Sequence, residues 1–183
     1  GDMPSEFDAL RGIDELTETS LVRRDAGNPQ RLRMLQTVQA FGREKLDEAG
    51  LLQTVETRHG EVYASRTRKL GEQIASIHEA KAANGIYDDM PNLRAAFDRA
   101  IARDLKLAAE LAVPLFLFNY WHRGAETGTW YERIMTRPGA DKLAQAPILL
   151  AAAAGHAFHD EGDRPKATAF IGRGLQAEAA GMQ

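Results

Sequence analysis

Alanine is the residue that most constrains the fold of this chain. It occupies 30 of the 183 positions, and 10 of these alanines follow residue 150. Alanine is the best helix former, and its small side chain lets neighbouring helices approach closely. β-branched residues are sparse. The sequence therefore predicts a mostly all-α protein built from antiparallel helix pairs.

The rest of the composition excludes several classes of protein. Cysteine is absent, so disulfides, thiol catalysis and cysteine-based zinc sites are ruled out. The formal net charge of −3 disfavours a strongly basic nucleic-acid binder. The longest apolar runs, 111–118 and 146–154, are too short to span a bilayer, and the polar N-terminus does not resemble a signal peptide. We expect a cytoplasmic protein without membrane contact.

One segment near the N-terminus has the pattern of a β-hairpin. In the run 31–35, Leu32 and Met34 alternate with Arg31 and Arg33, which is the period of a half-buried strand. The run 21–24 supplies a partner strand, and the Gly, Asn and Pro between the two runs are typical of a hairpin tip.

Apolar residues at three- and four-residue steps predict helices along the rest of the chain. The predicted ranges are 8–19, 37–49, 54–80, 104–122, 128–135, 147–159 and 165–180. Residues 81–90 predict a loop with Asn84 and Gly85 as its turn, and Pro91 is expected to begin the next helix. Pro114 predicts a kink near Glu110.

These elements predict three parts. Residues 1–50 form a segment of helix, hairpin and helix. Residues 51–90 form a long linking helix and a loop, and residues 91–183 form a helical array. One domain boundary is expected within the loop at 81–90, and a second is expected near Gly50.

The last helix pair resembles the tetratricopeptide repeat. Gly155, Phe158, Gly162 and Ala167 follow its order of small, aromatic, turn and small residues, and the apolar Ile171 comes four residues after Ala167. The resemblance implies that facing helices touch at the Gly and Ala positions and that Phe fills the groove between pairs, in a short right-handed array. An array of two or three units without a cap favours self-association as a homodimer.

A larger part of the chain resembles the region downstream of the nucleotide-binding core in large bacterial ATP-binding transcriptional regulators, the signal-transduction ATPases with numerous domains. The resemblance rests on LTETSLV at 16–22, RLRMLQTVQAF at 31–41, PNLRAAF at 91–97 and YWHRG at 120–124. It implies that residues 1–50 are a partial winged-helix-like segment, namely the end of a winged helix, and that residues 91–183 form a tetratricopeptide-like array. The ATPase motif G-x-x-x-x-G-K-[ST] does not occur, so ATP binding is not implied.

Aromatic residues gather around Gly124 at a junction between helices. They are Tyr120, Trp121, Trp130 and Tyr131. Such residues usually belong to the core, but a groove lined by them would bind a peptide or a small effector. We treat these four as the candidate interaction surface.

A basic cluster on the hairpin supports an alternative function in nucleic-acid binding. Its candidate contacts are Arg23, Arg24, Arg31 and Arg33, with Arg43 and Lys45 nearby. Arginines on a hairpin can contact phosphates as a wing does, although phosphate contacts alone give little sequence specificity.

His156 and His159 support a second alternative, a metal-binding or enzymatic protein. They lie three residues apart on a predicted helix and are followed by Asp160, Glu161 and Asp163. The spacing differs from the His-Glu-x-x-His zinc motif. The favoured interpretation is a non-enzymatic segment of a bacterial regulator that binds a protein partner or a small effector, without a metal, a cofactor or catalytic residues.

Overall fold

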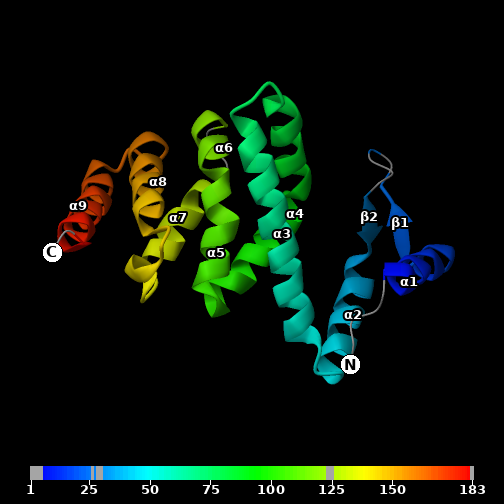
Figure 1. Ribbon diagram of the computed structural model, residues 1–183. Coiled ribbons are helices and arrows are strands. Elements are labelled where there is room, and N and C mark those ends of the chain that lie inside the picture. Colours follow the sequence, from blue (N-terminus) through cyan, green and yellow to red (C-terminus); the bar gives the residue numbers. More distant parts are fainter. Residues whose placement is uncertain (1–5, 26, 28–30, 123–125, 182–183) are drawn as a thin grey trace. The chain divides into compact units, whose positions relative to one another are not determined.

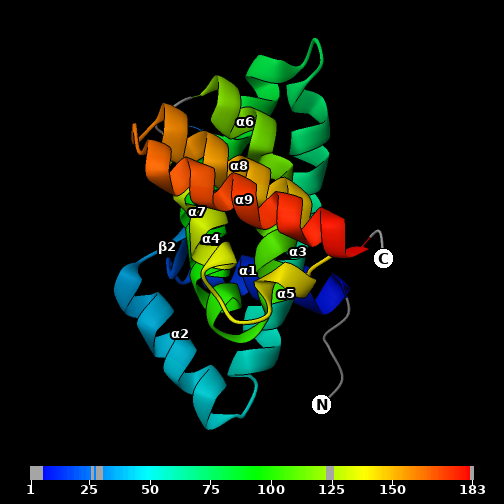
Figure 2. The ribbon, with the colours of Figure 1, turned by 90° about the vertical axis from the view of Figure 1, so that its left-hand side faces the viewer.

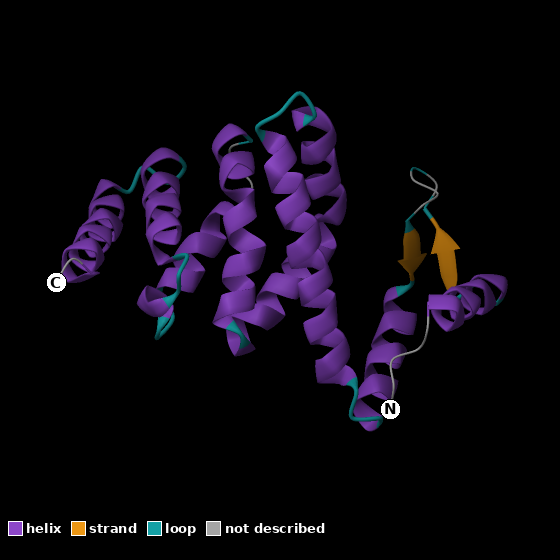
Figure 3. Ribbon diagram, in the orientation of Figure 1, coloured by secondary structure: helices purple, strands orange, loops and turns teal. Residues whose placement is uncertain are grey.

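A computed structural model describes residues 6–25, 27, 31–122 and 126–181. Helices dominate these residues and the sheet found among them has two strands, so the mostly all-α class with a small N-terminal hairpin is confirmed (Figure 3). The chain divides into two compact units, Gly1–Thr54 and Val55–Gln183. The division lies close to the boundary expected near Gly50.

The first unit contains two helices and the hairpin. Its elements are α1 (Glu6–Glu18), β1 (Val22–Arg24), β2 (Leu32–Met34) and α2 (Gln36–Glu48). The strands are antiparallel, and Val22, Arg23 and Arg24 pair with Met34, Arg33 and Leu32 respectively.

Both helices of the first unit end in a left-handed residue. Gly50 has a φ of +68° after α2, and Ser20 has a φ of +59° after α1. The Gly50 N–H donates to Asp47 O at 2.9 Å and the Leu51 N–H to Leu46 O at 2.8 Å, which is the Schellman pattern. Gly50 thus ends α2 and lies one residue past the helix predicted over 37–49.

The second unit is a succession of helices. They are α3 (Leu52–Ile74), which begins just before the unit boundary, α4 (Glu79–Arg103), α5 (Leu105–Ala112), the 3₁₀ turn η1 (Val113–Leu115), α6 (Phe116–Trp121), α7 (Gly128–Met135), the 3₁₀ turn η2 (Ala140–Lys142), α8 (Ala146–His159) and α9 (Arg164–Gly181). Within this unit the helices follow one another in a row from α3 to α9 (Figure 1).

Neighbouring helices of this row pack along their length. Helix α9 lies alongside α8, and the residues at 160–163 reverse the chain between them (Figure 2). The core that joins the helices is rich in alanine, as the composition predicted. Its buried alanines include Ala82, Ala83, Ala96, Ala108, Ala109, Ala112, Ala152 and Ala153.

The loop predicted over residues 81–90 is wrong. These residues belong to α4, which continues through Pro91, and α3 ends at Ile74 instead of near Ala80. The boundary expected within 81–90 therefore lies inside α4. Gly85 is a packing residue, because a Cβ added there would lie 3.1 Å from Leu70 Cδ2 on α3.

Pro114 interrupts its helix as expected, but at the proline itself and not near Glu110. The backbone tightens into η1 at residues 113–115 and resumes as α6. Proline lacks the N–H that the α-helical ladder requires, so the turn changes its hydrogen-bond pattern there.

The repeat-like pattern of the last helix pair is only partly reflected in the packing. Gly162 forms the turn with a φ of +70°, and Ala167 is buried. Gly155 does not mark a close approach of two helices, since a Cβ added there would meet nothing within 4 Å. Phe158 and Ile171 are 47% and 54% exposed, so the expectation that Phe158 fills a groove between pairs is wrong for the described residues.

Candidate functional site

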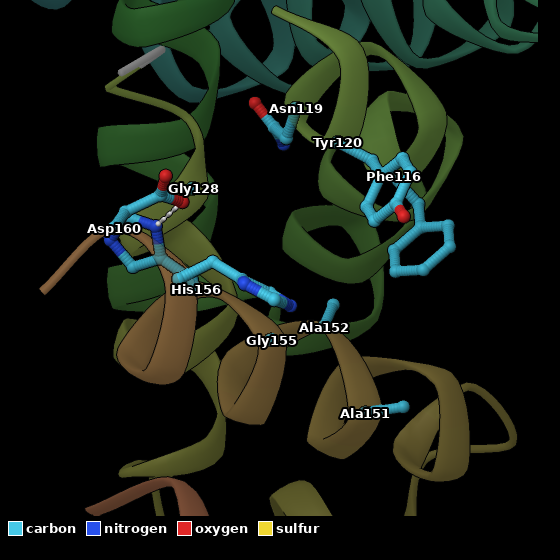
Figure 4. Close-up of a pocket in the computed structure, with 10 residues that line it drawn as sticks. Phe116, Asn119, Tyr120, Gly128, Ala151, Ala152, Gly155, His156 and Asp160 are labelled. Carbon is cyan, nitrogen blue, oxygen red and sulfur yellow. Dashed lines mark hydrogen bonds and ion pairs between the residues drawn. The ribbon is translucent and has the colours of Figure 1, made fainter. Parts of the chain in front are cut away.

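A small pocket lies between α6, the start of α7, and α8 (Figure 4). Its volume is about 140 Å³. The lining residues are Phe116, Asn119, Tyr120, Gly128, Ala151, Ala152, Gly155, His156, His159 and Asp160. All of them belong to the second unit.

Aromatic side chains and small residues form two sides of this pocket. Phe116 and Tyr120 are four residues apart on α6, so they project from the same side of the helix. Figure 4 shows both rings across the pocket from His156, with Ala151, Ala152 and Gly155 of α8 below. The resulting cavity is apolar along most of its length.

His156 and Asp160 close the polar end of the pocket. His156 Nδ1 lies 2.9 Å from Asp160 Oδ2, and its Nε2 lies 3.7 Å from Glu161 Oε1. Gly128 packs against the imidazole, because a Cβ added at Gly128 would lie 2.6 Å from His156 Nδ1. The absence of a side chain at residue 128 is therefore what lets the imidazole occupy this position.

A buried hydrogen-bond chain fixes the back of the pocket. Thr127 Oγ1 donates to Asn119 Oδ1, and Asn119 Nδ2 donates to Tyr131 Oη. Thr127 and Tyr131 are almost fully buried, and burial raises the pKa of Tyr131. The Asn119 amide is thus held in one orientation by partners on both of its ends.

Carboxylates outnumber ammonium groups beside the polar end. Lys166 Nζ contacts Glu132 Oε2 at 2.7 Å and Glu161 Oε2 at 2.8 Å. Hydrogen bonds to Glu132 and then to Glu161 raise the pKa of Lys166. With Asp160 and the His156 imidazole bonded to it, this network holds three carboxylates and one ammonium, so it carries excess negative charge even when His156 is counted as a cation.

The four predicted aromatic residues do not form one surface. Tyr120 and Trp121 are 58% and 48% exposed, whereas Trp130 and Tyr131 are buried. Trp130 stacks on Phe97 of α4 with ring centroids 4.1 Å apart. The interaction surface expected from all four is wrong in this respect, because the side of α7 that carries Trp130 and Tyr131 faces the core. Tyr120 alone of the four lines the pocket.

The predicted basic cluster is split by the pleat of the hairpin. Arg23 and Arg33 pair across the strands and share one face, whereas Arg24 pairs with Leu32 on the other. Arg33 forms an ion pair with Asp25, and Arg31 lies just before β2. On α2, Lys45 is paired with Glu48 at 2.6 Å. The four arginines therefore do not present a single cationic face.

His156 and His159 both line the pocket, but the acidic residues after them have other partners. Asp163 caps α9 by accepting from the Lys166 N–H at 2.9 Å, and Glu161 pairs with Lys166. Among residues 6–25, 27, 31–122 and 126–181, no group of three or more His, Asp or Glu side chains is arranged to hold a metal ion. The geometry thus gives the metal-binding alternative no support.

Several pocket residues were not among the sequence-predicted site residues. Phe116 and Asn119 resemble ordinary members of an apolar helix, and Gly128 and Gly155 resemble helix-pair glycines. Asn119 offered the one available signal, since an amide in an apolar helix needs buried partners. Its partners are Tyr131 of α7 and Thr127, the residue before α7, and the sequence does not specify how α7 packs against α6.

Comparisons of the chain with protein-family models, with curated proteins and with solved structures find no match. Among the residues that the structure describes, no helix combines the length and the apolar character needed to cross a membrane.

Proposed function

We propose that the helical unit is a non-enzymatic recognition module that binds a protein partner by accepting one of its side chains in the pocket between α6 and α8. The size of the pocket favours a protein partner over a drug-sized effector. A cavity of about 150 Å³ holds a molecule the size of benzene, whereas drug-sized ligands occupy about 300–1,000 Å³. At about 140 Å³, the pocket has room for one side chain.

Exposed aromatic residues beside the pocket support a protein partner as well. Tyr120 and Trp121 end α6 with about half of their surface exposed. Tyrosine and tryptophan are enriched among the residues that contribute most binding energy in protein interfaces. A polypeptide that inserts one side chain into the pocket would cover these rings with the residues on either side of its anchor.

The sequence resemblance extends this proposal to a biological setting. We place the module in a cytoplasmic bacterial transcriptional or signalling regulator, where the partner would be another protein or another domain. The setting rests on the four sequence blocks that resemble such regulators, and the binding role rests on the pocket.

A variant that fills the pocket tests the binding role. Gly155 lines the pocket and a Cβ added there meets nothing within 4 Å, so Gly155→Leu should fold and occupy the cavity. Gly172→Leu in α9 is a matched control, since Gly172 also has open space around it and does not line the pocket. Peptides selected from a displayed random library against the full chain supply the binding partners.

We expect selected peptides to bind the unaltered chain and Gly172→Leu equally, and to bind Gly155→Leu at least about tenfold more weakly, which corresponds to about 1.4 kcal/mol. The melting temperatures of the two variants should match. Peptides that bind all three proteins equally, or a library without binders, would overturn the proposal.

A further inference from the structure

We propose that the pocket between α6 and α8 selects an arginine side chain of the partner polypeptide. The inference rests on the proposed function and names the chemistry of the anchoring residue. Three properties of the pocket support it: its aromatic wall, its excess negative charge and its narrow apolar floor.

The aromatic wall matches the flat face of a guanidinium group. Phe116 and Tyr120 stand side by side along α6, and Figure 4 shows both rings beside the pocket. A guanidinium group stacks on aromatic faces and is more weakly hydrated than the ammonium group of lysine. The wall therefore favours a planar cation over a compact one.

The charge at the polar end requires that the guest be cationic or neutral. Asp160 lines the pocket, and Glu161 and Glu132 lie behind it with one ammonium, that of Lys166, between them. A carboxylate accepts several hydrogen bonds, so Asp160 can receive a guanidinium N–H while it remains bonded to His156. A carboxylate guest would be repelled by the same groups.

The floor suits the methylene groups of the same side chain. Ala151, Ala152 and Gly155 present an apolar, narrow surface between the aromatic wall and the polar end. Arginine carries three methylene groups that pack on apolar surface while the charged group reaches a polar one. Its length and its two chemical parts thus match the two parts of the pocket.

The test compares two compounds of the same shape and different charge. N-acetyl-arginine methylamide and N-acetyl-citrulline methylamide are titrated into the full chain, with backbone NMR signals of Ala151, Gly155 and His156 as the readout. We expect the arginine compound to shift these signals and the citrulline compound to bind about tenfold more weakly, because the loss of the cation removes both the cation–π and the charge contribution. Equal binding of the two compounds, or shifts elsewhere only, would overturn the inference.

A charge-neutralising variant provides the second arm. Asp160→Asn should weaken binding of the arginine compound by about tenfold, and leave binding of the citrulline compound unchanged. Asp141→Asn is the control, since Asp141 pairs with Arg173 and does not line the pocket. A fall in affinity for both compounds would indicate a merely structural role for Asp160 and would contradict the inference.

The library peptides separate this inference from the proposed function. We call a peptide pocket-dependent if it binds Gly155→Leu more weakly than the unaltered chain. Pocket-dependent peptides that lack arginine would support the proposed recognition module and overturn the arginine preference. Binding of the arginine compound without any pocket-dependent peptide would identify a free small guanidinium compound as the ligand, and would overturn the assignment to a polypeptide. Pocket-dependent peptides that share an arginine, whose replacement by citrulline abolishes binding, would support both.

Discussion

Gly71 and Gly155 both lie inside helices, but their surroundings require glycine in only one case. A Cβ added at Gly71 would lie 2.4 Å from the carbonyl oxygen of Pro114, whereas one added at Gly155 would meet nothing within 4 Å. Backbone atoms cannot move aside as the end of a flexible side chain can. Gly71 is therefore a contact residue between α3 and η1.

We predict opposite effects for the same substitution at these two glycines. Gly71→Ala should lower the free energy of unfolding by about 1–3 kcal/mol through overpacking. Gly155→Ala should raise it by about 0.5–1 kcal/mol, because alanine loses less backbone entropy in a helix. Urea denaturation followed by circular dichroism measures both changes. A stabilising Gly71→Ala would show that α3 and η1 do not pack as described.

His59 is a second residue whose surroundings decide its chemistry. Its Nδ1 lies 3.0 Å from Arg99 Nη2, and a guanidinium group can only donate, so Nδ1 accepts and the imidazole is neutral. Burial and then the charge of Arg99 lower the pKa of His59, against the opposing effects of Asn92 and Glu56. Protonation would place a second cation against Arg99.

We predict that His59 makes the protein less stable in mild acid. Because the pKa of His59 is lower in the folded than in the unfolded chain, the unfolded chain binds more protons as the pH falls below about 6.5. The neutral imidazole therefore contributes to the stability of the folded protein above a pH of about 6.5, and this contribution is lost as the pH falls below that value. Melting temperatures between pH 7.5 and 5 measure the loss. His59→Gln should flatten the profile, and His78→Gln, at an exposed position, should leave it unchanged; the opposite pattern would contradict the assignment.

At the scale of the elements, α4 shows how tertiary packing overrides local signals. Asn84, Gly85 and Pro91 are each unfavourable inside a helix, yet α4 extends through all three. Ile86 and Leu93 of this segment are buried in the core, and Asp89 is paired with Arg66 of α3. The apolar and ionic contacts thus outweigh the local cost of a turn-forming sequence in a helix.

The junction between α4 and α5 depends on one cap. Asp104 is the N-cap of α5, where its Oδ1 accepts from the Leu107 N–H at 3.0 Å. We predict that Asp104→Ala lowers the free energy of unfolding by about 1 kcal/mol, because the Leu107 N–H at the start of α5 loses its side-chain acceptor. Asp104→Ser, which keeps an acceptor, should stay within about 0.5 kcal/mol of the unaltered chain. Equal losses in both variants, measured by urea denaturation, would mean that the cap contributes nothing.

At the scale of the whole molecule, an apolar groove lies between α8 and α9 at the C-terminal end of the helical row. Its lining includes Leu150 and Phe170 and the exposed Ile171 and Leu175. The homodimer expected from the sequence stays a prediction, and this groove is the surface that would form it. Contiguous exposed apolar side chains such as these favour association.

We predict a concentration-dependent dimer that depends on this groove. Light scattering after size-exclusion chromatography should give a mass above 20.1 kDa at high concentration. Replacing Ile171 and Leu175 by Glu should shift the mass towards the monomer, because charged groups do not pack on an apolar surface, while the helical content stays the same. A monomer at every concentration, or a dimer that the double substitution does not affect, would remove the prediction.

The first unit differs from the second in how little apolar surface it buries. Val22 is the one buried apolar side chain among its described residues, and Phe7, Leu10, Leu35 and Phe41 are mostly exposed. A segment that buries so little gains little hydrophobic free energy on folding. The resemblance of its hairpin to a wing remains a prediction.

The sequence alone determined the helical class, the hairpin and most helix bounds. Alanine content, apolar spacing and helix ends are local properties, and Gly128–Met135 matched its predicted range. Gly50 likewise ended α2 because its left-handed backbone disfavours other residues.

Only the tertiary structure decided which of these residues make a site. The burial of Trp130 and Tyr131, the exposure of Tyr120 and the approach of Gly128 to His156 all depend on how separate helices pack. A helix pattern specifies which side of each helix is apolar, but the partner of that side is chosen by the mutual fit of distant side chains. For the same reason the pocket, whose walls come from α6, α7 and α8, has no signature in any single segment of the chain.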